Sequence, residues 1–282
     1  MRTVHAIADV RAASREARAA GRSVGLVPTM GAFHAGHAAL MRAARKACDL
    51  VVVSLFVNPT QFNDPADLAA YPRTAEQDAA MAQELGVDVL WAPSAEEMYP
   101  DGFATTVTVG GLGEVLEGAA RGPGHFAGVC TVVAKLFNAG EPDVAYFGQK
   151  DAQQVAVLRR MVRDLDFGLR IEVVPTVREP DGLALSSRNV HLAGEDRVRA
   201  LRLSRALDAA RSAVDGGERD GERIRAAALQ AMGDVEPDYL AVVDPDTLEP
   251  LTAVNGRVLV AVAARVGPTR LIDNTLIQVA TP

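Results

Sequence analysis

The sequence lacks the features of a secreted or membrane-spanning protein. Only two of its 282 residues are cysteines, Cys48 and Cys130, and both lie in apolar stretches with helical character. No apolar run approaches the roughly 20 residues that span a bilayer. Charged residues interrupt positions 1–21, which therefore do not resemble a signal peptide. We expect a soluble cytoplasmic protein with both thiols reduced and buried.

The sequence also lacks an excess of positive charge. It contains 29 Lys and Arg against 36 Asp and Glu, a net charge of -7. Proteins that bind nucleic acid or anionic membranes without specificity present basic surface, so we expect neither partner. An anionic small molecule is still an allowed substrate, because a few cationic side chains can reverse the field inside one cleft.

Short β-branched runs alternate with helical patterns through the first 180 residues. Continuous apolar strands that alternate with helices are typical of a parallel sheet covered on both faces. We therefore predict an α/β fold. The expected strands are 23–28, 50–57, 87–92, 143–148 and 170–177, and the expected helices are 7–20, 37–47, 74–85, 125–138 and 151–165.

The pattern changes after about residue 180. Two long helical stretches are followed by β-like runs without alternation, which favours a separate, smaller α+β unit. The helical stretches are 194–214 and 220–233, and the β-like runs are 239–243, 257–263 and 270–277.

Polar segments follow four of the expected parallel strands. They begin near Pro28, Ser54, Ala145 and Pro175. Open parallel sheets bind ligands at the carboxyl ends of their strands. We expect the four segments to converge on one cleft.

The segment after the first of these strands contains HAGH, with His34 and His37 three residues apart and Gly31 and Gly36 beside them. Chance packing, half of a zinc site and a phosphate-binding turn are the three interpretations. Zinc needs further ligands, and the other three histidines show no ligand spacing. Glycine lets the backbone approach a bulky ligand, and a helix N-terminus favours anions. The pattern favours a phosphate-binding turn.

GQKD follows another strand, and a lysine there is often a solvated rim residue. Beside HAGH, however, Lys150 could neutralise a polyphosphate, and Asp151 could accept hydrogen bonds from ribose hydroxyls. In LSSRN the serines could simply cap a helix. Capping does not call for Arg188, whose planar cation suits phosphate. In NPTQF, Gln61 matters only if a polar substrate must be oriented, and a turn alone explains the motif equally well.

Eight motifs together resemble the pantothenate synthetase family. HAGH is similar to the HxGH signature of adenylate-forming nucleotidyltransferases, and LSSR is similar to their mobile second motif. The resemblance is specific over about residues 23–190 and looser toward the C-terminus. In chain order the motifs are PTMGAFHAGH, NPTQF, YPRT, MYPDGF, PGHFAGV, KLFN, FGQKD with the following QQ, and DGLALSSRN.

The resemblance implies a Rossmann-like, doubly wound domain that binds ATP and pantoate over 1–178, a smaller lid domain over 179–282, and a homodimer. It also implies a two-step ligation that uses Mg²⁺ and ATP. Pantoate attacks the α-phosphorus of ATP to give pantoyl adenylate and pyrophosphate. The amine of β-alanine then attacks the acyl carbon, which releases pantothenate and AMP.

The resemblance also assigns roles to single residues. His37, His34 and Lys150 are catalytic, with His37 donating a proton or a hydrogen bond to the leaving phosphates. Gln61 and Gln154 hold pantoate, with Gln61 near β-alanine too. Asp78 is the acidic candidate for magnesium. ATP is bound by Met30, Gly31, His34, His37, Gly148, Lys150, Asp151, Val177, Leu185, Ser186, Ser187 and Arg188.

Three positions depart from the family pattern. An extra glycine, Gly122, separates Arg121 from the following Pro-Gly-His-Phe. Gln149 stands where the family usually has Glu, and Ala152 stands where it has an aromatic residue. We expect the last two changes to tune packing rather than remove activity.

Two other functions remain open from the sequence. A nucleotidyltransferase of the same fold, such as a cytidylyltransferase, would stop at nucleotidyl transfer, but the Gln61 and Gln154 cluster argues against it. A nucleotide-binding regulatory protein without turnover would not need His37, Lys150 and Arg188 together.

Overall fold

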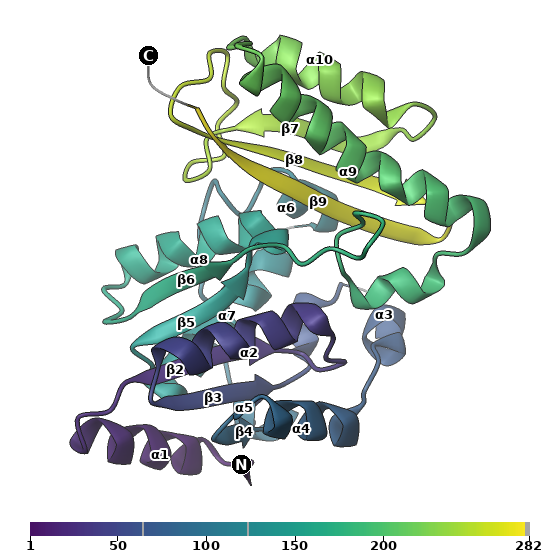
Figure 1. Cartoon of the computed structure of the whole chain (residues 1–282). Helices are drawn as coiled ribbons and strands as arrows, with labels where there is room; N and C mark the ends of the chain where they lie inside the picture. The colour runs from purple at the N-terminus through teal and green to yellow at the C-terminus, as the bar shows by residue number, and fades with distance from the viewer. Residues whose placement is uncertain (64, 123, 280–282) are drawn as a thin grey trace. The chain divides into compact units, whose positions relative to one another are not determined.

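The computed structural model describes residues 1–63, 65–122 and 124–279. The chain divides into two compact units (Figure 1). The first unit comprises residues 1–148 and 157–174, and the second comprises residues 149–156 and 175–282.

The first unit is built on a six-stranded parallel sheet of order β1-β4-β3-β2-β5-β6. This confirms the predicted α/β class. The strand β1 was not predicted, because three residues are too few to show a periodicity. The strands are β1 (Arg2–Val4), β2 (Val24–Thr29), β3 (Leu50–Leu55), β4 (Val89–Trp91), β5 (Val144–Gly148) and β6 (Arg170–Val174).

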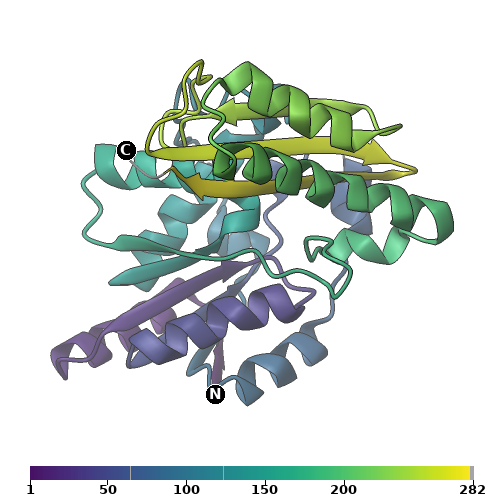
Figure 2. The same cartoon turned by 45° about the horizontal axis from the view of Figure 1, so that its top comes forward.

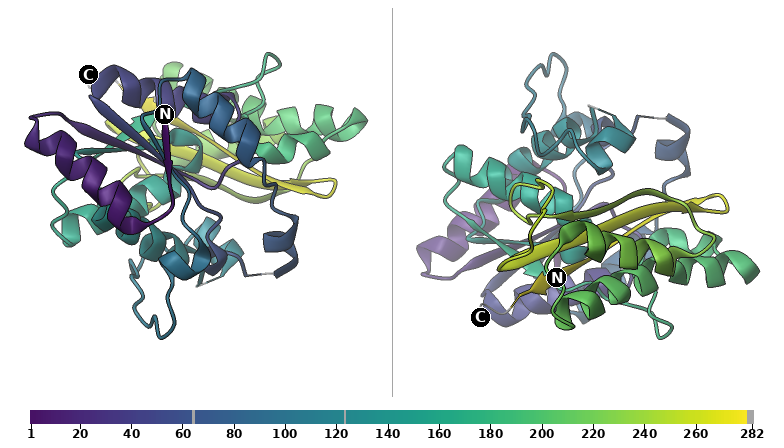
Figure 3. Two further views of the ribbon diagram at one scale, coloured as in Figure 1. Left: turned by 90° about the horizontal axis from the view of Figure 1, so that it is seen from below. Right: turned by 90° about the horizontal axis from the view of Figure 1, so that it is seen from above.

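Helices cover both faces of this sheet, as the continuous apolar strands predict. α1 (Ile7–Ala19) packs with α7 (Gly124–Gly140), and both contact β2. α2 (Ala35–Ala47) packs with α4 (Ala75–Glu84) on the opposite face (Figure 3, left). The remaining helices are α3 (Pro65–Ala70), α5 (Ala95–Met98), α6 (Glu117–Arg121) and α8 (Ala152–Asp164), with short 3-10 helices η1 (Pro59–Gln61), η2 (Gln149–Asp151) and η3 (Ser187–His191).

The core beneath α2 joins the helix to the sheet. Leu40 and Met41 of α2 pack on Val27, Val51 and Val53 of the neighbouring strands. Both cysteines are free and buried, as expected, with Cys48 at the end of α2 and Cys130 within α7. Among the described residues, no helix is long and apolar enough to cross a membrane.

The order in which strands are added to the sheet reverses between β2 and β5. From β2 the chain proceeds through β3 and β4 toward one edge, and β5 and β6 extend toward the other. Because β3, β2, β5 and β6 are consecutive neighbours, the four predicted polar segments begin at adjoining strand ends. Ligands of open α/β sheets bind at such a switch point, which here lies at the ends of β2 and β5.

The second unit contains an antiparallel sheet of order β7-β8-β9, which confirms the predicted α+β unit. α9 (Gly194–Asp215) and α10 (Gly221–Met232) pack on one face of this sheet (Figure 2 and Figure 3, right). Their apolar faces share one core with alternate residues of the strands. The strands are β7 (Pro237–Val243), β8 (Arg257–Val266) and β9 (Thr269–Gln278).

The last predicted strand of this sheet ends earlier than expected. The apolar run 170–177 forms a strand only as far as Val174. Pro175 has no N–H to donate to a neighbouring strand, and a proline is therefore a natural end for a paired strand.

Gly128 allows α7 to pack directly on the backbone of η1. A Cβ at this position would lie 2.3 Å from the carbonyl oxygen of Thr60 and 2.8 Å from the amide nitrogen of Gln61. Since both neighbours are backbone atoms, no side-chain rotation could relieve the contact. The position of Gln61 therefore depends on the absence of a side chain at Gly128.

We expect Gly128→Ala to lower the free energy of unfolding by about 1–3 kcal/mol, the usual cost of overpacking. The matched control is Gly140→Ala in the same helix, where the nearest atom would lie at 3.7 Å. Urea unfolding of both variants measures the difference. Equal stability of the two would contradict the close packing of α7 on η1.

Candidate functional site

The segment that joins β2 to α2 turns through two left-handed residues. Gly31 has φ of +89° and Ala32 has φ of +52°. A Cβ on Gly31 would lie 2.7 Å from Leu55 Cδ1 and 3.0 Å from an Asp78 oxygen, so only glycine fits. Ala32 differs, since left-handed backbone is unfavourable for a residue with a Cβ. Something outside the turn must hold it in this conformation.

The carboxylate of Asp78 supplies that support. Asp78 lies in the first turn of α4 and is 2% exposed. Its Oδ2 accepts a hydrogen bond from the N–H of Ala32 at 3.0 Å, and its Oδ1 accepts from the N–H of Phe33 at 2.7 Å. The hydroxyl of Thr74 donates to Oδ1 at 3.2 Å. Asp78 therefore stabilises the turn through its main-chain N–H groups.

His34 and His37 begin α2 with their rings 4.2 Å apart between centroids. His34 is the N-cap residue, and its Nδ1 accepts a hydrogen bond from the N–H of Gly36 at 3.1 Å. The N–H of His34 donates to Nδ1 of His37 at 3.3 Å. Since Nδ1 of each ring is an acceptor, the proton of each neutral imidazole lies on Nε2.

The His37 ring is held in its neutral form. Burial, together with a smaller contribution from the charge of His34, lowers the pKa of His37 to about 3. At neutral pH His37 can therefore donate a hydrogen bond from Nε2 without carrying a charge. Of the two roles predicted for His37, proton donor or hydrogen-bond donor, a neutral ring favours the second.

Gln61 ends η1 and is held by a polar network. Its Nε2 lies 3.0 Å from Sδ of Met30, and its Oε1 accepts from Nδ2 of Asn58 at 3.1 Å. Asn58 is 1% exposed and also donates to the carbonyl of Gly128 at 3.1 Å. The hydroxyl of Tyr99 donates to Oδ1 of Asn58 at 2.7 Å. Asn58 thus holds a candidate site residue in place, and the sequence interpretation missed it because its motif could be explained as a simple turn.

The second unit contains the other predicted residues except Gly148, which ends β5 in the first unit. Lys150 and Asp151 lie in η2, and Gln154 lies in the first turn of α8. Among the described residues, none forms a salt bridge with Lys150 or Arg188. Both cations are partly or fully exposed and are available to an anionic ligand.

A small hairpin joins two of the predicted ATP-binding stretches. The N–H of Leu185 donates to the carbonyl of Val177 at 2.9 Å, and an isolated bridge pairs Arg178 with Ala184. Ser186 caps η3 by accepting from the N–H of Arg188 at 3.3 Å. Ser186 is therefore a helix cap, as one interpretation of the motif predicted. The Arg188 side chain takes no part in the cap, to which this residue contributes only its main-chain N–H.

Asp78 is the residue that the sequence predicted as a magnesium ligand. No cluster of three or more potential metal ligands occurs among the described residues. Each oxygen of Asp78 accepts a backbone hydrogen bond, so part of the acceptor capacity of this carboxylate is already used. The structure shows that Asp78 braces the turn, and metal ligation by Asp78 stays a prediction.

A doubly wound parallel sheet with imidazoles at a helix N-terminus beside its switch point defines a nucleotide-binding α/β enzyme. The sequence matches the profile of the family described as pantoate-beta-alanine ligase over residues 2–276. The chain belongs to this family of ligases, whose reaction is the ATP-dependent joining of pantoate and β-alanine.

Individual relatives agree with this membership. Pantothenate synthetase of Acidobacterium capsulatum is 55% identical, with 98% of this chain and 97% of the relative covered. That of Heliobacterium modesticaldum is 53% identical, with 99% and 100% covered.

Solved structures give the same result. The crystal structure of pantothenate synthetase from Thermus thermophilus matches with a TM-score of 0.90 at 50% identity, covering 98% of this chain and 99% of that one. A Francisella tularensis pantoate-beta-alanine ligase, described as complexed with beta-gamma ATP and beta-alanine, matches with a TM-score of 0.78 at 35% identity, covering 98% and 97%.

We expect the His37 imidazole to stay neutral, with its proton on Nε2, from pH 8 down to about pH 4. The folded pKa of about 3 lies below the ordinary 6.5, so between these values only the unfolded chain binds the proton. The contribution of His37 to stability therefore falls as the pH is lowered through this window. Nitrogen NMR of labelled histidine measures the charge state and the tautomer of the ring, and His37→Gln identifies the signal. A midpoint near pH 6.5 would contradict the neutral donor.

We expect Asp78→Asn to lower the free energy of unfolding by about 1–3 kcal/mol, because a buried N–H of the turn loses its acceptor. Turnover should fall as well, since the turn carries His34. The Mg²⁺ concentration that gives half-maximal activity should not change. Thr74→Val is the control, because it removes only the hydroxyl contact to the same carboxylate. A tenfold or larger rise in the Mg²⁺ requirement would make Asp78 a metal ligand instead.

Proposed function

We propose that this ligase joins pantoate to β-alanine through a pantoyl adenylate, with release of pyrophosphate and then AMP. A carboxylate is a poor acylating agent at neutral pH, and adenylation gives its acyl carbon a good leaving group. In the first step a pantoate oxygen forms a bond to the α-phosphorus of ATP while the bond to pyrophosphate breaks. In the second step the β-alanine nitrogen bonds to the acyl carbon and AMP departs.

The observation that carries this proposal is the neutral His37 imidazole at the start of α2. Its Nδ1 is engaged by the main chain, which leaves Nε2–H to donate toward the leaving phosphates as their charge increases. A fixed donor of this kind needs no reorganisation during the reaction and stabilises the transition state more than the ground state. His34, which caps the same helix, is proposed to bind ATP beside it.

We assign the remaining ATP contacts to residues that the sequence predicted. The Lys150 ammonium neutralises the polyphosphate, and Asp151 accepts from the ribose. Arg188 and its neighbouring serines bind phosphate. The space beside Gly148 is open, since a Cβ placed there would have no atom within 4 Å. The full set is Met30, Gly31, His34, His37, Gly148, Lys150, Asp151, Val177, Leu185, Ser186, Ser187 and Arg188.

Gln61 and Gln154 are proposed to bind pantoate, with Gln61 near β-alanine too. Both side chains are neutral, so they can orient a carboxylate without pairing it so tightly that its attack on phosphorus is suppressed. The network around Asn58 supports this role, since it fixes both the amide plane and the position of Gln61.

Magnesium is proposed to accompany ATP rather than to occupy a site made by the protein. Mg²⁺ commonly binds substrate phosphates with only one or two protein ligands. This agrees with the lack of a ligand cluster among the described residues.

The organisation of the enzyme is proposed in the same way. We assign the binding of ATP and pantoate to residues 1–178 and a lid role to residues 179–282. We further propose a homodimer that works in the cytoplasm on three small-molecule substrates.

The order of steps predicts that ATP–pyrophosphate isotope exchange needs pantoate and Mg²⁺ but not β-alanine. Since His37 acts on the leaving phosphates, His37→Ala should reduce this exchange by about 10²–10³ while the protein stays folded. Exchange that requires β-alanine would contradict the adenylate. Near wild-type exchange in His37→Ala would remove His37 from the first step.

A further inference from the structure

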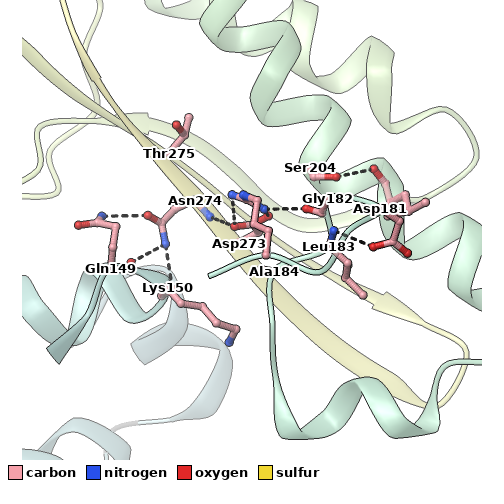
Figure 4. Close-up of polar contacts among 12 residues, drawn as sticks. Gln149, Lys150, Asp181, Gly182, Leu183, Ala184, Ser204, Asp273, Asn274 and Thr275 are labelled. Atoms are coloured by element: carbon pink, nitrogen blue, oxygen red, sulfur yellow. Dashed lines mark hydrogen bonds and ion pairs between the residues drawn. The ribbon is translucent and has the colours of Figure 1, made fainter. Parts of the chain in front are cut away.

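The strand β9 holds the main chain of the turn that contains Lys150. The Nδ2 of Asn274 donates to the carbonyl of Gln149 at 2.9 Å and to that of Lys150 at 2.8 Å. Its Oδ1 accepts from Nε2 of Gln149 at 2.9 Å (Figure 4). Asn274 is 4% exposed. One buried side chain therefore forms three hydrogen bonds with two consecutive residues of η2.

The turn needs such an anchor because it is only three residues long. Short 3-10 helices have poor internal hydrogen-bond geometry and little stability of their own. Lysine carries its charge on a flexible stem, so the region that its ammonium can reach depends on where the backbone lies. Figure 4 shows the Lys150 side chain extending away from Asn274. The anchor thus fixes the main chain and leaves the ammonium available.

The neighbouring residue of β9 holds a second segment. Both oxygens of Asp273 accept from Arg178, from Nη1 at 2.6 Å and from Nη2 at 3.0 Å. The Arg178 Nη1 also donates to the carbonyl of Gly182 at 3.1 Å, inside the hairpin that carries Val177. Adjacent residues of a strand point to opposite faces. Asp273 and Asn274 therefore fix two different segments from opposite faces of one strand.

We propose that Asn274 is a positioning residue that places Lys150 for the adenylation step. This inference rests on the proposed role of Lys150 in binding the phosphates of ATP. The proposed action of Asn274 is indirect, through the hydrogen bonds that its side chain donates to the main chain of η2. Asp273 completes the arrangement by anchoring the hairpin beside it.

The first test is Asn274→Asp, which keeps the size of the side chain and replaces its N–H donor by an oxygen facing two carbonyls. ATP–pyrophosphate exchange with saturating pantoate should fall by roughly 10–100-fold, because small displacements of a catalytic group are costly. The KM for β-alanine in the overall reaction should stay unchanged. Thr275→Val on the same strand removes a hydroxyl that accepts from Arg211 and should keep normal exchange.

The decisive test is a double-mutant cycle with Lys150→Ala. If Asn274 acts through Lys150, Asn274→Asp should change exchange by no more than about twofold once Lys150 is absent. Independent effects that multiply would overturn the positioning role while the function of Lys150 stands. Normal exchange in Lys150→Ala alone would instead refute the proposed role of the lysine, and the inference with it.

Thermal unfolding of each variant separates positioning from loss of the fold. Should Asn274→Asp unfold at the assay temperature, Asn274→Ala carries the same cycle, because it removes the donor without burying a second acceptor. A folded Asn274→Ala protein with wild-type exchange would overturn the proposal.

Discussion

The hydrogen bonds between the Asp78 carboxylate and the turn that joins β2 to α2 are the interaction on which the position of His34 and His37 depends. The turn places Ala32 in left-handed backbone, a conformation that is unfavourable for alanine because of its Cβ. Two N–H groups donate to the buried carboxylate and offset that strain. His34 follows immediately and caps α2, so the placement of both imidazoles is linked to a side chain on α4. Strain at a functional site is thus maintained by a partner distant in sequence.

The candidate site also depends on the charge states of its side chains. A histidine is usually considered for its charge, yet the His37 ring is held here in its neutral form. Its Nδ1 accepts a main-chain hydrogen bond, which fixes the tautomer, and burial disfavours the imidazolium. Cationic charge for the polyphosphate is instead assigned to Lys150 and Arg188, which have no salt-bridge partner among the described residues. The neutral imidazole and these two cations therefore come from different parts of the chain.

The second unit repeats the logic of the Asp78 brace with different chemistry. Residues 149–156 directly follow β5 in the chain but belong to the compact unit that contains β9. Asn274 stabilises η2 through carbonyl groups, whereas Asp78 stabilises its turn through N–H groups. In both cases a buried polar side chain forms two hydrogen bonds with the backbone of a short irregular segment. Such segments cannot hold their conformation alone, because they have few internal hydrogen bonds.

The sequence by itself determined the alternation of strands and helices, the change of pattern near residue 180 and the motifs that resemble one ligase family. These are local signals, since the side-chain period, glycine and proline act over a few residues. It did not reveal β1, which is too short to show a period, or the role of Asn58, whose motif is explained equally well by a turn. Only the tertiary structure decided that Asp78 braces a turn, that His37 is neutral and that Asn274 holds the lysine turn. Each of these depends on burial or on a partner from another element, and neither is encoded in the spacing of neighbouring residues.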